Sequence, residues 1–240
     1  MITLRRANKR HLDQYRKQEV RFTFNRQGQA NTNDDCFGAL ENLSDSSLPP
    51  AGVSLVRPSQ GAETVTYIYR GALAQEDSTG SAGVVRAGEF QRMTFGPGIP
   101  HRETNASRTD WAQFFRISLR HSEVVPDRAP EQMRFAAAER RNVLCVVASP
   151  DGRQGSLRIH QDALVCSSVL DPGQHVVHEL LPGRCAWLHV ICGEATSHDV
   201  ILNRGDGVGV ATERSLSLTA RESTEILLID IGKTGPRCAA

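Results

Sequence analysis

Residues 61–103 read GAETVTYIYRGALAQEDSTGSAGVVRAGEFQRMTFGPGIPHRE. Within them, β-branched and aromatic residues concentrate at positions 64–69, which is typical of a strand. Turn-forming residues fill positions 77–81, and a Gly-Pro-Gly sequence at 96–98 interrupts the chain again. Short strands that Gly and Pro interrupt at short intervals predict an all-β sandwich or barrel.

The stretch that follows continues this pattern. Apolar and polar residues alternate from 111 to 119, which predicts a strand with one buried face made of Trp111 and every second residue up to Leu119. Many of the aromatic residues lie in this half of the chain: Tyr67, Tyr69, Phe95, Trp111, Phe114 and Phe115. We expect most of them in the core, and the alternative is that one or two line a pocket for a planar ligand.

A second series of strand signals begins after residue 157. Residues 187–194 take the place in this series that residues 66–71 take in the first one. A weak internal repeat of this kind predicts two tandem barrels.

The junction between the two series is predicted between residues 121 and 141, where Pro126 and Pro130 frame a charged segment. We place the first domain at residues 1–130 and the second at 140–235. The run 132–140 contains several good helix formers, and a short helix is expected there.

Composition narrows the class of protein. The chain has 240 residues, of which 39% are hydrophobic and 23% charged, and this argues against disorder. A net charge of +1 without a basic stripe gives little support to nucleic-acid binding. No apolar run reaches the length that crosses a bilayer, and residues 1–6 carry no signal-peptide core. We expect a cytoplasmic protein with no membrane or nucleic-acid partner.

The cysteines give no sign of a disulfide framework. Cys36, Cys145, Cys166, Cys185, Cys192 and Cys238 include no C-x-x-C pair. In a reducing compartment the expectation is free thiols. Arg184, beside Cys185, is the one neighbour that favours a thiolate, so redox sensing is kept as the less favoured alternative.

Four segments within 61–103 carry a family resemblance. Residues 61–67, 77–85, 93–94 and 98–103 resemble, in order and spacing, the N-terminal cupin of the pirin family. The resemblance implies an all-β fold of two tandem cupin barrels, each a double-stranded β-helix of the jelly-roll type, with one or two short helices. It also implies that the ends of the chain cross over between the barrels.

In metal-binding members of that family, three histidines and one glutamate hold iron or a similar divalent ion. The resemblance assigns two of these positions to His101 and Glu103. Because residues two apart on a strand point to the same face, both side chains are expected to point into the barrel. The family's remaining two ligands form a His-x-His pair, and here those positions are Arg57 and Ser59. The sequence thus keeps half of a metal set that suits Fe, Mn, Ni or Cu.

Arg57 changes the electrostatics of this predicted pocket. Arginine offers no lone pair to a metal, and Ser59 is a poor substitute for imidazole. A buried Glu103 needs a positive partner, and the guanidinium of Arg57 is a candidate for that role. We therefore predict a metal-free pocket lined by Arg57, Ser59, His101 and Glu103, without a cofactor. The alternative is Fe or another divalent transition metal on His101, Glu103 and further ligands.

Other titratable residues are given structural roles. Glu63 and Glu89 are expected on the barrel rim, in solvent. His175 and His178 are three apart on a predicted strand, so their rings should point to opposite faces and share no ion. His160 stands alone in the sequence and suggests no chemistry.

Three functions are compatible with the resemblance. The first is a metal-free bicupin that binds a small molecule or acts in regulation. The second is a metal-dependent dioxygenase of the quercetin-cleaving type, in which Glu103 is the candidate base and no other catalytic residue is identified. The third is a protein-interaction module that uses the outer barrel surface. The missing His-x-His pair favours the first function over the second, while the ligand and the oligomeric state stay open.

Overall fold

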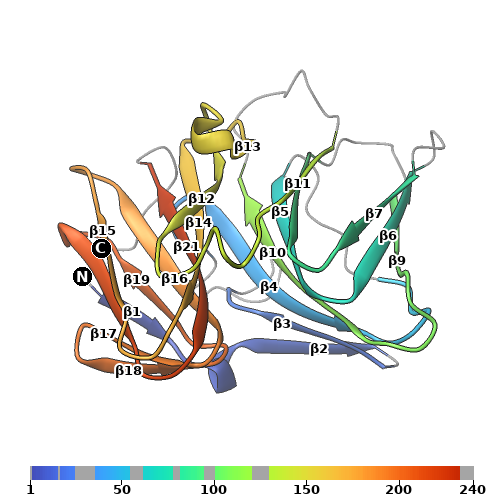
Figure 1. The fold of residues 1–240 in the computed structure, drawn as a ribbon, viewed down its shortest axis with the longest axis horizontal. Helices are drawn as coiled ribbons and strands as arrows, with labels where there is room; N and C mark the ends of the chain where they lie inside the picture. The colour runs from blue at the N-terminus through green and yellow to red at the C-terminus, as the bar shows by residue number, and fades with distance from the viewer. Residues whose placement is uncertain are drawn as a thin grey trace.

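The computed structural model describes residues 2–15, 17–24, 36–54, 62–77, 82–94, 101–120 and 130–232 of the 240. Of Asp77 and His101 only the backbone is described. The described chain folds into strands arranged as two barrels that lie side by side (Figure 1). This confirms the predicted all-β class with two cupin domains.

The first barrel is built from a seven-stranded and a three-stranded sheet. In spatial order the larger sheet contains β11 (Glu131–Arg134), β8 (Glu89–Thr94), β5 (Glu63–Arg70), β10 (Ala112–Leu119), β4 (Leu40–Leu48), β3 (Gln18–Phe22) and β2 (His11–Tyr15). The smaller sheet contains β7 (Ala82–Arg86), β6 (Ala72–Asp77) and β9 (His101–Asn105). All pairs in both sheets are antiparallel.

The second barrel is built from a seven-stranded and a four-stranded sheet. The larger sheet contains β1 (Ile2–Arg5), β19 (Gly207–Val210), β16 (Cys185–Cys192), β21 (Thr224–Ile231), β14 (Ala163–Leu170), β12 (Cys145–Ser149) and β13 (Leu157–Arg158). The smaller one contains β15 (His175–Glu179), β20 (Ser215–Ala220), β17 (Glu194–Ser197) and β18 (Val200–Asn203).

The N-terminal strand crosses between the barrels. β1 pairs antiparallel with β19, so residues 2–5 extend a sheet of the second barrel, and the chain then enters the first barrel at β2 (Figure 1). This is the crossing of ends that the family resemblance implied. The boundaries at 1–130 and 140–235 stay a prediction.

The prediction of a short helix at residues 132–140 is wrong. Residues 131–134 form the edge strand β11, in which Met133 lies opposite Phe90. Phe135 is buried, with its ring edge-on to Phe90 at a centroid distance of 5.6 Å. Packing of Phe135 and of the partly buried Met133 against the core overrides the helix propensity of the alanines that follow. Residues 136–140 form a hydrogen-bonded turn, and the helices among the described residues are two three-residue 3₁₀ segments, Ala7–Lys9 and Arg153–Gly155.

A hydrophobic core joins the two barrels. It combines Tyr67, Phe90 and Phe115 of the first barrel with Trp187 and Leu227 of the second, among other buried residues. Because neither barrel can bury these faces alone, the two halves are expected to unfold together.

A buried polar bridge crosses the same interface. The hydroxyl of Tyr67 donates to Glu225 Oε1 at 2.5 Å, and Arg140 Nη1 donates to the same oxygen at 2.7 Å. Arg140 also donates to the hydroxyl of Ser167 at 2.8 Å. Burial, followed by the charge of Glu225, raises the pKa of Tyr67 far above its ordinary value. The tyrosine therefore stays a neutral donor and fixes the first barrel to the second.

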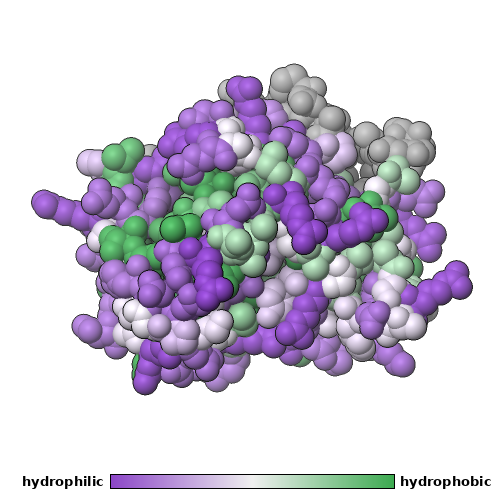
Figure 2. Space-filling model, viewed as in Figure 1, coloured by the Kyte–Doolittle hydropathy of each residue, from purple (hydrophilic) through white to green (hydrophobic). Residues whose placement is uncertain are grey.

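The molecular surface is mainly hydrophilic on the face shown in Figure 2, with hydrophobic residues in small separate groups. The large hydrophobic side chains that are most exposed include Tyr15 and Leu181. No helix in the described part of the chain has both the length and the apolar character needed to cross a membrane.

Candidate functional site

The interiors of the two barrels differ in chemistry. The second barrel is filled by aliphatic side chains, among them Leu188, Val190, Leu218 and Leu228. The first barrel has a smaller apolar cluster that comprises Leu48, Ile68, Leu73, Val85, Ala112 and Phe114. Beyond that cluster, its described strands carry buried polar side chains, among them Gln75, Glu103 and Arg116.

Strand periodicity brings these polar side chains together. Arg116 on β10 lies two residues from Phe114 and therefore shares its inward face. In register, Arg116 lies opposite Thr66 on β5 and opposite Ser44 on β4. All three are buried, at 4%, 3% and 6% exposure. The face of β10 that was predicted to be buried does pack in the core between the barrels, through Phe115, Ile117 and Leu119. The expectation of only one buried face is wrong, because the inward face with Phe114 and Arg116 is buried as well.

The centre of this polar interior is an ion pair. Arg116 Nη2 donates to Glu103 Oε1 at 2.5 Å, and both side chains are 5% exposed or less. Gln75 Nε2 lies 3.5 Å from the same carboxylate oxygen, and Arg116 Nε lies 3.4 Å from the hydroxyl of Thr66. Two buried charges at this distance are stable only as a pair, because either one alone would lose its hydration without compensation.

Arg116 is the functional residue that the sequence analysis missed. Arg57 and Ser59 lie outside the described residues, as does the side chain of His101, so the predicted Arg57–Glu103 pair stays a prediction. The signal for Arg116 was present, since alternation over 111–119 places an arginine on the face opposite to Phe115. Its place beside Glu103 depends on how the two sheets of the first barrel face each other, which residue patterns along the sequence do not reveal.

The strand that carries Glu103 is held from two sides. β9 pairs with β6, with Gln75 opposite Glu103. On its other side the backbone N–H of Ser54 donates to the carbonyl of Glu103 at 2.8 Å, and Val53 bridges to Thr104. The chain leading to Arg57 thus runs alongside β9 up to Ser54. This keeps Arg57 and Ser59 as candidates for the same pocket.

The residues present do not fit a set of three histidines and one glutamate. Arg57 and Ser59 occupy the His-x-His positions, and the carboxylate of Glu103 is bound by a guanidinium. Within the described ranges, no three His, Cys, Asp or Glu side chains lie close enough to hold a metal ion together. The family set would thus lack two imidazoles by residue type, and the one glutamate that the resemblance assigns to it is already paired with a cation.

The second barrel carries a polar network at one end of its apolar interior. His178 Nε2 lies 2.7 Å from Asp230 Oδ2, and Arg184 Nε donates to Asp230 Oδ1 at 2.6 Å. Arg184 also donates to Asp162 at 2.7 Å. His175 is exposed and bonds Thr219 instead, which confirms that the two histidines of β15 point to opposite faces.

The cysteines that the structure describes are free. Burial, and next the charge of Asp230, raises the pKa of Cys166 to about 12. Cys185 is 1% exposed, so the neighbouring Arg184 does not make it an accessible thiolate. Cys238 lies outside the described residues.

The expectation that Glu63 is solvated is wrong. Its side chain is fully buried, and its carboxylate accepts from the backbone N–H of His160 at 2.8 Å and contacts the ring Nδ1 at 2.9 Å. His160, for which no chemistry was expected, is therefore a link between the barrels. Glu89 lies on the rim, as expected, where it accepts from the backbone N–H of Arg86 and from Gln132.

Most first-half aromatic residues lie in the core, as expected. Tyr67, Phe114 and Phe115 are at most 3% exposed. Tyr69 is partly buried against the core, and Trp111, at 46% exposure, lines a pocket on the outside of the barrel. Phe95 lies outside the described residues.

Comparisons with known proteins agree on one family. A family model described as Pirin matches residues 5–118, and one described as Quercetinase C-terminal cupin domain matches residues 146–231. The chain is 32% identical to the quercetin 2,3-dioxygenase of Escherichia coli (strain K12) over 231 residues, which cover 96% of this chain and 99% of the relative. It is 33% identical over 201 residues to a protein of Pseudomonas aeruginosa named as a putative quercetin 2,3-dioxygenase, covering 81% and 84%.

Solved structures give the same result. The bacterial pirin YhhW of Escherichia coli in complex with nickel(II) matches with a TM-score of 0.86 at 31% identity, covering 97% of this chain and 99% of that one. The protein YhaK from Escherichia coli matches with a TM-score of 0.73 at 25% identity, covering 82% and 86%. Together with the two barrels and the segments around His101 and Glu103, these matches show that the chain belongs to the pirin family.

Proposed function

We propose that this chain is a pirin-type bicupin with a degenerate metal site, and that its first barrel binds a small polar molecule without a metal. The observation that carries the proposal is the buried Glu103–Arg116 ion pair. In this pocket the guanidinium supplies the positive charge that a metal ion supplies in metal-binding pirins.

The pocket's donors and acceptors indicate the kind of ligand. Arg116 and Gln75 provide N–H donors, Glu103 provides acceptor oxygens, and Thr66 and Ser44 provide hydroxyls that do both. Arg57, Ser59 and His101 are proposed to complete the lining. Because the central pair is neutral overall, a small molecule with both hydroxyl or amide donors and acceptors suits it better than a bare ion.

A second function is favoured by the relatives' names. Several carry the name quercetin 2,3-dioxygenase, and one solved pirin is a nickel(II) complex. If this chain shared that activity, its metal would need ligands in place of the two missing histidines. Glu103 would then have to leave Arg116 to bind the metal or to act as a base.

Metal content separates these two functions. Untagged protein is analysed by elemental mass spectrometry before and after incubation with Fe, Mn, Ni, Cu and Zn. The wild type should hold far less than one metal per chain, and the Arg57→His/Ser59→His double variant should gain metal. An Arg153→His variant, with its histidine on the exposed surface, is the matched control.

Near-stoichiometric metal in the wild type, lost in His101→Ala and accompanied by flavonol-dependent oxygen uptake, would establish the dioxygenase function instead. If the first function holds, small molecules released on denaturation of the wild type should be absent from a Glu103→Gln/Arg116→Met double variant. Identical extracts from both proteins would contradict ligand binding at this pair.

A further inference from the structure

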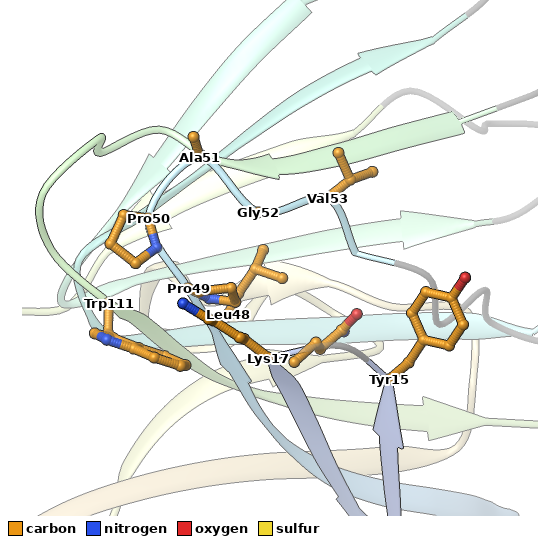
Figure 3. A pocket seen from close by; sticks show the side chains of 10 residues that line it. Tyr15, Lys17, Leu48, Pro49, Pro50, Ala51, Gly52, Val53 and Trp111 are labelled. Atoms are coloured by element: carbon orange, nitrogen blue, oxygen red, sulfur yellow. The ribbon is translucent and has the colours of Figure 1, made fainter.

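A pocket of about 760 Å³ lies on the outer wall of the first barrel, away from the Glu103–Arg116 pair. Three segments form it: the β2–β3 turn with Tyr15 and Lys17, the end of β4 with the turn at residues 48–53, and Trp111 just before β10 (Figure 3). Its volume is in the range of cavities that hold small organic ligands, roughly 300–1,000 Å³.

The lining is aromatic and apolar. Trp111 and Tyr15 are 46% and 56% exposed, although large aromatic side chains usually lie buried. Pro49, Pro50 and Val53 form the wall between them (Figure 3). Flat rings of this kind present faces against which a planar ligand packs.

The walls are held in place before any ligand arrives. Asn105 is 4% exposed, and its Nδ2 lies within 3.1 Å of the carbonyls of Leu48, Pro49 and Asp110. One buried amide thus ties the proline segment to the residue that precedes Trp111. A pocket whose walls are fixed in this way loses little freedom on binding, which raises affinity.

The turn at residues 49–52 is equally constrained. The backbone N–H of Gly52 donates to the carbonyl of Pro49 at 2.9 Å, and that of Ala51 donates to Ser107 at 2.8 Å. A Cβ at position 52 would come within 2.8 Å of the Pro49 oxygen, so glycine is required there. The proline wall is therefore a formed structure and not a loose loop.

The charge of the pocket defines its ligand further. Lys17 is the one charged side chain among the described residues that line the pocket, and no described acidic residue forms an ion pair with it. Figure 3 shows its side chain extending toward Pro49 and Trp111. An ammonium group next to aromatic and apolar faces complements a planar molecule that carries a negative charge.

We propose that this pocket binds a planar aromatic anion, such as an aromatic carboxylate. Trp111 and the proline wall hold the ring system, and Lys17 pairs with the acid group. The site is distinct from the barrel interior. The two sites are connected through residues 52–54. This segment contributes to the pocket wall and also bonds to β9, the strand whose inward face carries Glu103.

The test is calorimetric titration of the full chain with naphthoate and with its neutral analogue naphthamide. Naphthoate should bind one per chain. Trp111→Ala should weaken both ligands by about tenfold or more through the lost ring contact. Lys17→Met, which keeps the aliphatic stem, should weaken naphthoate several-fold and leave naphthamide unchanged. Leu181→Ala, exposed and outside the pocket, is the control and should leave both affinities unchanged.

Any of the following results would overturn the proposal. No binding, or wild-type affinity in Trp111→Ala, would show that the pocket is not the site. If Lys17→Met weakened the affinity for both ligands equally, the charge of Lys17 would have no role in binding. If sedimentation shows a dimer that becomes monomeric in Trp111→Ala, the groove is an interface between copies of the chain. Far-UV circular dichroism of each variant identifies any loss of fold.

Discussion

Removing Arg116 alone should cost this protein a large part of its stability. In Arg116→Met the carboxylate of Glu103, which is 5% exposed, loses its ion pair with the Arg116 guanidinium. Breaking a buried pair in this way costs about 3–5 kcal/mol. Whole domains are stable by about 5–15 kcal/mol, so the loss is about a fifth or more of a typical total. The midpoint of thermal unfolding should fall by roughly 6–20 °C.

The double variant Glu103→Leu/Arg116→Met provides the decisive comparison. Replacing both charges by apolar groups removes the desolvation penalty together with the attraction, so its stability should lie within about 1–2 kcal/mol of the wild type. The difference between the single and double variants isolates the coupling between the two side chains. Arg153→Met removes an exposed ion pair and should leave stability unchanged.

Urea unfolding followed by tryptophan fluorescence is a suitable assay, because Trp187 is fully buried in the core shared by both barrels. The comparison requires equal slopes of free energy against urea in all variants. A cost below about 1 kcal/mol in Arg116→Met, at an unchanged slope, would refute the reasoning. If Arg57→Met then became strongly destabilising in that background, Arg57 would be the second partner of Glu103.

Two further predictions use buried titratable groups. His189 is fully buried, and burial, with the charge of Arg10 next, holds its pKa well below the ordinary value. Because the unfolded chain binds the proton first, stability should fall as pH drops below about 6.5, by up to about 1.4 kcal/mol per pH unit from this residue. Between pH 7 and pH 5.5 the wild type should therefore lose more unfolding free energy than His189→Phe, and equal losses in the two proteins would contradict this. Cys166, with its pKa raised to about 12, should resist alkylation by iodoacetamide in the native protein at pH 8, and modification as fast as in urea, by peptide mass spectrometry, would contradict the burial.

The fold was predictable because its signals are local. Strand-forming residues at 64–69 and turn formers at 77–81 determine the backbone conformation of their own segments. Similar strand and turn signals recur along the second half of the chain. The predicted helix at 132–140 was wrong because a long-range contact, and not local propensity, decides the structure there. Its alanines favour a helix locally, whereas burial of Phe135 against Phe90 is a contact between distant residues.

The site was predictable in part. Glu103 was identified as a buried carboxylate in need of a cation, and it is one, but Arg116 is 13 residues away in the chain and lies in the other sheet of the first barrel, so the two side chains meet only across the barrel interior. Glu63 shows the same limit more strongly, since its partner His160 belongs to the other barrel, 97 residues along. Charge requirements follow from residue type and burial, but the identity of the partner follows from topology.

Arg116 also has a consequence for restoring a metal site. A divalent cation bound by His101 and Glu103 would lie near a guanidinium that already neutralises Glu103, and two buried cations repel each other. Adding histidines at positions 57 and 59 supplies donors but leaves this repulsion in place. A triple variant is therefore compared with the variant that has the two histidines alone, and it combines Arg57→His, Ser59→His and Arg116→Gln. Calorimetric titration should show that the triple variant binds nickel more tightly. Equal affinities would mean that Arg116 can turn away from the pocket, and the pair with Glu103 would then be one of two states of a barrel that still accepts metal.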